Sequence, residues 1–288
     1  MLHLSLLLML RRQMGVQLTA QIPQILCTIL AERVSMIRKV IECSLTFFLA
    51  FLWGTLVGLT GMGGGALMTP ALIFLGVEPV IAVGTDLLYA TVTRIFGVFF
   101  HHKNNGLRFD LALRLFIGSL PAILLGGFLL RNLDKALLNE YLTLLLGSVL
   151  LITSTLSLIK GEITVPIRPR REYLYLLGFV VGLTVQFTSV GAGVIVSFAL
   201  MNLARVNPRE VVGVTIVYGL ALSSFSFLNY AFLGRVDYSM ASALILGTLP
   251  GVYLGTRINS LVEREKLKKI INLIILVVGF LILAQRVL

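Results

Sequence analysis

The chain has 288 residues, of which 57% are hydrophobic and 13% are charged, and its formal net charge is +11. This composition leaves too little polar surface to cover a water-soluble domain of that size, so it predicts an integral membrane protein. The positive charge does not indicate nucleic-acid binding, because the Lys and Arg residues stand in short loops between apolar runs rather than in one patch.

The first 40 residues differ from the rest of the chain. Their apolar start is too short to span a bilayer, and Arg11 and Arg12 come after it, which is the wrong side for a signal peptide. We interpret 1–40 as an N-terminal extension. Two interpretations stay open, an amphipathic surface helix and a segment that precedes a translation start at Met36.

Apolar runs long enough to cross about 30 Å of hydrocarbon come next, each bounded by charge. They cover 80–100, 111–130, 141–159, 210–233, 240–258 and 270–288. Two further apolar stretches, 44–76 and 174–204, are too long for one span, and each is interrupted by a cluster of glycines. We predict that these two stretches form broken or re-entrant helical hairpins.

The same pattern occurs twice along the chain, about 129 residues apart. The cluster Gly-Met-Gly-Gly-Gly at 61–65 breaks the first stretch, and Ser-Val-Gly-Ala-Gly at 189–193 breaks the second. Each half has a broken hairpin and three crossings, and an odd number of crossings predicts opposite orientations. The expected fold is therefore an all-α polytopic membrane protein of two inverted repeats, 41–160 and 173–288, joined by a basic cytoplasmic linker at 161–172.

The distribution of Lys and Arg predicts how the protein lies in the membrane. If each hairpin returns to its starting side, one face carries roughly twice as many of these residues as the other, counted after the extension's Arg11 and Arg12 are set aside. The richer face is then cytoplasmic. We expect a multi-pass protein of the cell (plasma or inner) membrane with both termini outside.

Several motifs resemble the sulfite exporter TauE/SafE family of membrane transporters. In the first half these are Gly-Leu-Thr-Gly-Met-Gly-Gly-Gly-Ala at 58–66 with Pro70, Ala-Val-Gly-Thr-Asp-Leu at 82–87 and Gly-Ser-Leu-Pro at 118–121; in the second half they are Thr-Ser-Val-Gly-Ala-Gly at 188–193 and Gly-Thr-Leu-Pro-Gly at 247–251. The resemblance covers about residues 40 to 288. It implies a duplicated helical carrier of sulfite, organosulfonates or related sulfur-containing anions.

The chain also resembles one subgroup of that family, which has an Asp and a basic residue in the first long helix and a His pair after it. The corresponding residues are Asp86, Arg94, His101 and His102. The subgroup tends to repeat a Gly-x-Asp in the second half, where this chain has Gly-Val-Thr at 213–215. This departure puts a second acidic site in doubt, along with any mechanism that needs two.

The glycine breaks predict an anion site on physical grounds. A helix that begins after such a break has unpaired N–H groups and a positive dipole end, and glycine lets an oxyanion approach the backbone closely. Nearby hydroxyl and amide groups, including that of Thr69, add neutral donors. The predicted substrate-binding residues are Thr60, Gly61, Gly63, Gly64, Gly65, Arg94, Gln186, Thr188, Ser189, Gly191 and Gly193. The alternative is that the glycines only permit close helix packing.

Arg94 stands well inside a predicted span, where a charge costs about 2.5 to 3.5 kcal/mol on insertion scales. One interpretation makes it a fixed charge that attracts the anion, and another lets it reach the headgroups. Asp86 lies about 12 Å away along the helix axis and about 80° around it, which argues against a direct ion pair. We expect Asp86 to carry a coupling proton or cation; the alternative is a structural hydrogen-bonding role.

Small residues recur at every fourth position on two predicted helices, at 118, 122 and 126 and at 247, 251 and 255. Such faces let helices pack closely, either within one chain or between the subunits of a homo-oligomer. The sequence favours neither use over the other.

The sequence lacks the catalytic motifs of the enzyme classes that work inside membranes. There is no second membrane aspartate for an aspartyl protease, no His-Glu-x-x-His motif for a zinc enzyme and no phosphate-binding lysine motif. We therefore expect no enzyme activity, no cofactor and no metal. The expected function is secondary transport by alternating access, with a small anionic solute and the lipid bilayer as partners and no nucleic acid. The alternatives are an anion channel and a non-transporting membrane assembly or scaffold protein.

Overall fold

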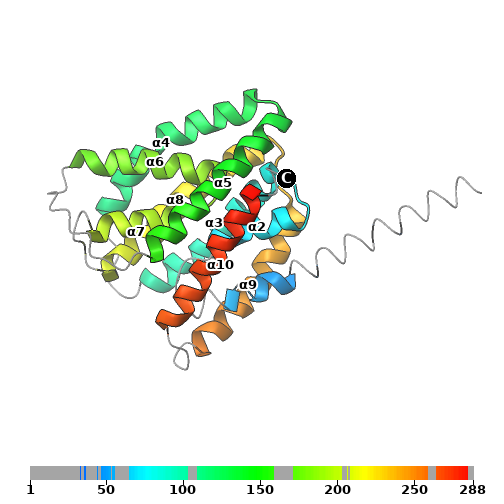
Figure 1. Ribbon diagram of the computed structural model, residues 1–288. Coiled ribbons are helices and arrows are strands. Elements are labelled where there is room, and N and C mark those ends of the chain that lie inside the picture. Colours follow the sequence, from blue (N-terminus) through cyan, green and yellow to red (C-terminus); the bar gives the residue numbers. More distant parts are fainter. Residues whose placement is uncertain are drawn as a thin grey trace, which may run out of the picture. The chain divides into compact units, whose positions relative to one another are not determined.

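A computed structural model describes most of the chain after residue 46. The described residues are 33, 36, 44, 47–52, 54–55, 65–102, 109–158, 171–202, 206, 208–258 and 264–284. The chain divides into two units, 1–45 and 46–288, and the second contains all the labelled helices. The described secondary structure of this second unit is entirely helical (Figure 1), which confirms the predicted all-α class.

Nine labelled helices succeed one another along the described part of this unit. They are α2 (Gly65–Phe74), α3 (Pro79–His102), α4 (Phe109–Asn132), α5 (Lys135–Leu158), α6 (Arg171–Thr188), α7 (Ala192–Asn202), α8 (Pro208–Phe232), α9 (Tyr238–Ile258) and α10 (Arg264–Ala284). Residues 47–52 and 54–55 are also helical and precede α2.

Four of the described helices, α3, α4, α5 and α8, are long and apolar enough to cross a membrane. The predicted spans at 240–258 and 270–288 correspond to α9 and α10, whose apolar parts within the described residues are Tyr238–Leu254 and Lys269–Ala284. The predicted break within 174–204 is present, since α6 ends at Thr188 and α7 begins at Ala192. The other predicted break lies outside the described residues.

Helix ends are set by local chemistry. Gly76, with φ of 86°, reverses the chain after α2, and Pro79 is the first residue of α3, where its missing N–H costs no hydrogen bond. Asp237 precedes α9, and its Oδ1 accepts a hydrogen bond from the Met240 amide at 3.0 Å. The turn between α2 and α3 is short, so these two helices pack as neighbours. The loop before α9 is also held close to α8, through the hydrogen bond from the Arg235 amide to the Tyr230 carbonyl.

Matching helix contacts recur in the two halves of the chain. On α4, a side chain at Gly118 would collide with the Tyr175 carbonyl of α6. On α9, a side chain at Gly247 would collide with the Phe47 carbonyl of the helical segment before α2. Gly118 and Gly247 are the glycines that the sequence repeat places in register, so both halves use the same kind of contact.

A second pair of contacts repeats this match. A Cβ added at Gly182 of α6 would lie 2.8 Å from the Ser119 Cβ of α4, and one added at Gly54 would lie 2.6 Å from the Thr248 carbonyl oxygen of α9. The described small residues on α4 and α9 therefore pack within the chain. Between these pairs, α3 packs on α8 and α5 on α10 (Figure 1). The opposite orientation of the two halves stays a prediction.

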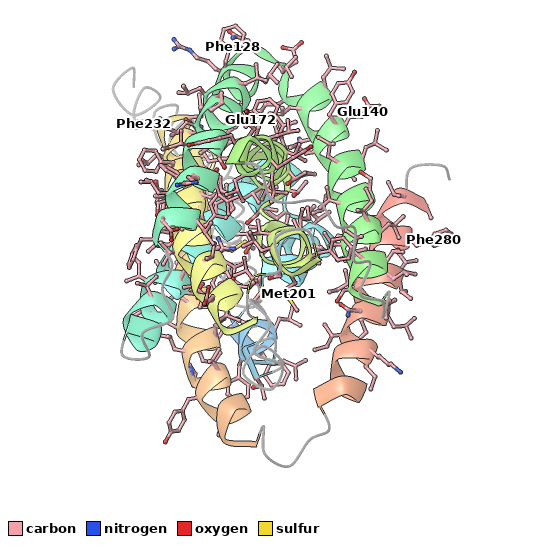
Figure 2. All side chains as sticks on the ribbon, turned by 90° about the vertical axis from the view of Figure 1, so that its left-hand side faces the viewer. Phe128, Glu140, Glu172, Met201, Phe232 and Phe280 are labelled. Atoms are coloured by element: carbon pink, nitrogen blue, oxygen red, sulfur yellow. The ribbon has the colours of Figure 1, made fainter. Side chains whose placement is uncertain are left out.

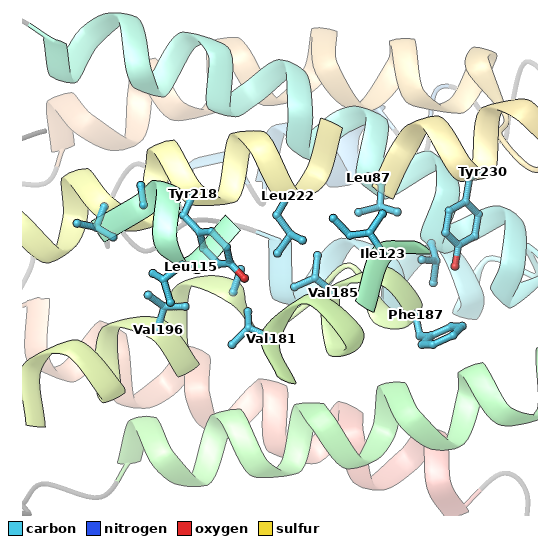
Figure 3. Packing of buried hydrophobic residues seen from close by; sticks show 14 of the residues in the cluster. Leu87, Leu115, Ile123, Val181, Val185, Phe187, Val196, Tyr218, Leu222 and Tyr230 are labelled. Carbon is cyan, nitrogen blue, oxygen red and sulfur yellow. The ribbon is translucent and has the colours of Figure 1, made fainter. Parts of the chain in front are cut away.

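The largest core cluster of the described residues includes side chains from each helix from α3 to α8 (Figure 3). Leu87, Leu115, Val181 and Leu222 belong to it, and all four side chains are fully buried. The opposite pattern holds on the outside, where Phe128, Phe232 and Phe280 project from three different helices (Figure 2) and are 65%, 85% and 62% exposed. An apolar exterior of this kind suits contact with lipid, because hydrocarbon imposes no cost on exposed apolar side chains.

The substitution Gly118→Val tests the close packing of α4 on α6. The added side chain would overlap the backbone of Tyr175, which cannot move aside as a flexible side chain can. We expect a loss of about 1–3 kcal/mol of stability, measured as a lower thermal unfolding temperature of the purified protein in detergent. Leu124→Val, at an exposed position on the same helix, is the matched control; equal unfolding temperatures for both variants would contradict the packing described.

Candidate functional site

The break between α6 and α7 has an unusual backbone. Ser189 has φ of 59° and Gly191 has φ of 102°, so a non-glycine residue occupies the left-handed region close to a glycine that does the same. The Thr188 hydroxyl accepts a hydrogen bond from the Val190 amide at 3.2 Å and stabilises the turn. The first bond of α7 runs from the Ile195 amide to the Gly191 carbonyl at 2.9 Å. The amides of residues 192–194 therefore have no acceptor within the helix.

A buried carboxyl group faces this break. Asp86 of α3 is completely buried, and its Oδ2 accepts a hydrogen bond from the Thr69 hydroxyl of α2 at 2.5 Å. The Ser189 side chain lies beside the same carboxyl group, but neither Ser189 Oγ nor Asp86 Oδ1 has a hydrogen-bond partner among the described residues. The structure thus brings α2, α3 and the break together around one acid.

Arg94 lies two turns further along α3 and is held by α8. Its Nη1 donates a hydrogen bond to the Gly219 carbonyl at 2.9 Å. A Cβ at Gly219 would lie 2.9 Å from Arg94 Nε, so the glycine makes room for the guanidinium group. Arg94 acts electrostatically on Asp86, while Asp86 makes its hydrogen bond to Thr69.

Further polar groups that sequence reasoning missed lie near Arg94. Tyr218 of α8 is buried and acts electrostatically on the guanidinium group. Its hydroxyl oxygen lies 2.8 Å from Ser119 Oγ of α4, which also donates to the Gly178 carbonyl of α6 at 2.8 Å. A polar residue inside a predicted span was a signal for each of them, but the sequence did not show that three helices would place them together.

The predicted residue Gln186 has a different setting from Ser189. Its side chain packs against α4, where a Cβ at Gly126 would collide with it. Its backbone carbonyl accepts a hydrogen bond from the Tyr230 hydroxyl of α8 at 2.9 Å. The side-chain amide is buried, and both its nitrogen and its oxygen lack partners in the described part of the chain.

Two other predicted residues, Thr188 and Gly193, have different surroundings from one another. The Thr188 hydroxyl donates to the Thr184 carbonyl of its own helix at 2.6 Å, so its proton is already used. Gly193 is exposed, and a Cβ added there would have no heavy atom within 4 Å. The first-half cluster cannot be compared, because Thr60, Gly61, Gly63 and Gly64 lie outside the described residues and Gly65 is described only as the first residue of α2.

Several buried side-chain polar atoms have no hydrogen-bond partner in the described part of the chain. Among the described residues they are Asp86 Oδ1, Gln186 Nε2 and Oε1, Ser189 Oγ, Ser226 Oγ and Arg235 Nη1. They come from α3, the α6–α7 region, α8 and the loop after α8. A buried polar atom without a partner costs free energy, so Asp86 Oδ1 and Ser189 Oγ, whose side chains lie beside one another, indicate a position where another group binds.

Metal binding has no support in the described part of the chain, which holds no group of three or more His, Cys, Asp or Glu residues that could bind an ion. The His101 and His102 pair closes α3, and the structure describes their backbone only.

Comparison with known proteins places the chain among transporters. Residues 46–282 match the family described as sulfite exporter TauE/SafE. The chain is 36% identical over 239 residues to the probable membrane transporter protein YjnA of Bacillus subtilis, covering 78% of this chain and 94% of that protein. It is 27% identical over 247 residues to the probable membrane transporter protein YdhB of the same organism, covering 83% and 99%.

A more distant relative comes from another organism. The probable membrane transporter protein MJ0441 of Methanocaldococcus jannaschii is 24% identical over 260 residues, covering 83% of this chain and 94% of that protein. No solved structure gives a significant match. Because the family match spans most of the chain and the related proteins are matched over nearly their whole length, this multi-pass membrane protein belongs to the sulfite exporter TauE/SafE family of membrane transporters.

Proposed function

We propose that this chain is a secondary transporter that moves a small anion across the plasma membrane by alternating access. The observation that carries the proposal is that two buried polar atoms without a hydrogen-bond partner, Asp86 Oδ1 and Ser189 Oγ, belong to side chains that meet at the α6–α7 break. The family name supports sulfite, an organosulfonate or another sulfur-containing anion as the substrate. The proposal includes the inverted orientation of the two halves and termini on the outer side.

The chemistry of the break suits an anion that must also be released. At the break itself, the Ser189 hydroxyl is a neutral donor without a hydrogen-bond partner in the described part of the chain. The amides at the start of α7 add backbone donors and the positive end of a helix dipole. Neutral donors bind an oxyanion more weakly than a charged donor does, so the bound anion dissociates more readily.

Arg94 supplies the positive charge of the proposed site. Its anchored Nη1 fixes the guanidinium group against α8, and guanidinium has five N–H donors in all, so several remain for other acceptors. We propose that this charge attracts the anion from the side of the membrane at which α3 ends. A small anionic solute and the lipid are then the principal partners, and the small-residue faces provide packing within the chain.

Asp86 is the proposed coupling group. A negative carboxylate beside the break would repel an incoming anion, because like charges interact strongly where water is excluded. A proton or another cation on Asp86 removes that repulsion. Binding of the cation and binding of the anion would then favour one another, which is the thermodynamic requirement for coupled transport.

The first experiment is flux of labelled sulfite, thiosulfate, taurine and sulfoacetate into proteoliposomes, with and without an imposed pH gradient. We expect saturable flux of one of these anions. Non-saturating currents would favour an anion channel, and absence of flux from correctly folded protein, together with retained binding to a protein partner, would favour a scaffold.

Arg94→Gln is expected to raise the half-saturation concentration for the transported anion by about tenfold, because it removes a charged donor worth roughly 1.5–3 kcal/mol to a charged partner. Glutamine is shorter than arginine and gives up the hydrogen bond to the Gly219 carbonyl, so protein abundance and unfolding temperature are measured alongside to separate loss of binding from loss of fold. Arg131→Gln, which removes an exposed charge at the end of α4, is the matched control. An unchanged half-saturation concentration would remove Arg94 from the site.

Asp86→Asn is expected to make anion flux insensitive to the imposed cation gradient, because the amide cannot gain or lose the coupling charge. Its oxygen can still accept the Thr69 hydrogen bond, so the fold should persist. Flux is measured across a range of imposed pH and Na⁺ gradients, with Glu78→Gln as a control at an exposed acid. Gradient dependence equal to that of the wild-type protein would show that the coupling ion binds elsewhere.

A further inference from the structure

The loop between α8 and α9 is held tightly on α3 and carries an arginine. The Arg235 amide donates to the Tyr230 carbonyl at 2.9 Å, after Gly234 turns the chain with φ of 64°. The Arg235 carbonyl packs against Gly84 of α3, where any Cβ would collide with it. The Asp237 amide donates to Thr85 Oγ1 at 3.0 Å. The backbone of Arg235 is therefore fixed from both sides.

The side chain of Arg235 is left with an unused donor. Its Nη1 is buried and has no hydrogen-bond partner among the described residues. The nearby acid, Asp237, uses Oδ1 to cap α9 through the Met240 amide. A buried guanidinium N–H without an acceptor costs free energy. The structure thus indicates a missing acceptor at this position.

A second unused donor belongs to a residue bonded to the same tyrosine. Tyr230 is fully buried, and Arg235 acts electrostatically on its hydroxyl group. Its hydroxyl donates to the Gln186 carbonyl at 2.9 Å, and Gln186 Nε2 is a buried amide nitrogen without a partner in the described part of the chain. Tyr230 thus connects Arg235 with Gln186, which lies three residues before Ser189 of the break.

We propose that Arg235 and the Gln186 amide, on either side of Tyr230, form a binding subsite for a small oxyanion at the membrane side where α8 ends. We call it the α8-end subsite. The inference rests on the proposed function and deepens it, since the subsite would hold the transported anion before it reaches the break or after it leaves.

The positions of the charged residues along α3 support this order of binding. Arg235 packs at Gly84, Asp86 comes two residues later and Arg94 ten residues later, which is about 15 Å along a helix axis. The α3–α8 pair therefore carries one arginine at the end where α8 finishes and another near its middle, with the acid between them. An anion that approaches from the α8 end meets Arg235 first and Arg94 last.

The donor chemistry defines the ligand class. A guanidinium group and an amide present planar N–H donors that suit an anion with two or more oxygens on one atom, such as sulfite or a sulfonate. Lysine would keep the charge but lose the planar fork. The subsite is therefore expected to distinguish Arg235→Lys from the wild-type protein.

The test uses proteoliposomes with the protein in one orientation, determined by protease access to a terminal tag. Sulfite flux is measured from each side for the wild-type protein, Arg235→Gln, Arg235→Lys and Tyr230→Phe. Arg131→Gln removes an exposed charge at the end of α4 and is the matched control. Unfolding temperatures without sulfite show that each variant is folded, and sulfite titrations of these temperatures report binding without transport.

We expect Arg235→Gln to raise the half-saturation concentration about tenfold from the α8-end side and to change it little from the other side. Arg235→Lys and Tyr230→Phe should have intermediate effects. An unchanged value from both sides in an actively transporting Arg235→Gln protein would overturn the subsite and leave the proposed function intact.

Failure of the proposed function gives a different result. If the wild-type protein transports none of the anions, sulfite-induced thermal stabilisation that is lost in Arg235→Gln would still support the subsite. Equal stabilisation of both proteins, or none in either, would overturn it.

Discussion

A polar group that water cannot reach needs a partner from within the protein, and the bundle is arranged around this constraint. Each regular helix satisfies its own backbone except at its ends. At the α6–α7 break, the end of α6 and the start of α7 are buried within the protein. Ser189 and Gly191 adopt left-handed backbone conformations there, and the donors that the break leaves free become the natural place for a polar ligand.

Close packing makes the break possible. Backbone carbonyls approach Gly118, Gly178 and Gly247 so closely that a side chain at any of them would collide. In a bilayer the hydrophobic effect does not drive helices together, so such van der Waals contact between backbones is a principal source of stability. The rigid pairs that result hold α6 against α4, and with it the break against α3.

Charge inside this bundle is sparse and is placed along one helix pair. Asp86 is bonded to Thr69, Arg94 is bonded to the Gly219 carbonyl, and Arg235 packs on Gly84 through its backbone. The acid therefore lies between two cations without a direct hydrogen bond to either. Asp86 and Arg94 act on one another electrostatically without a direct hydrogen bond, so each can respond to a ligand, which is a requirement for a transport cycle.

Local features determined what the sequence alone predicted correctly. Hydropathy and glycine clusters are read residue by residue, so they sufficed for the all-helical membrane class, the long spans and the break before Ala192. One difference was at α9, whose apolar part ends at Leu254 because Arg257 lies in the last turn of the helix. The family was evident from motifs whose order along the chain is itself sequence information.

Tertiary structure alone decided which side chains meet. The rotation of α2 and α3 places Thr69 on Asp86, and the turn at Ser189 directs its side chain to the same acid. The side chain of Gln186, which was predicted together with Ser189 to bind the substrate, packs on Gly126. The sequence did not single out Arg235 among the loop charges, because the burial of its Nη1 atom depends on how the α8–α9 loop folds onto Gly84. Contacts between distant segments depend on helix rotation and register, which hydropathy and local motifs do not specify.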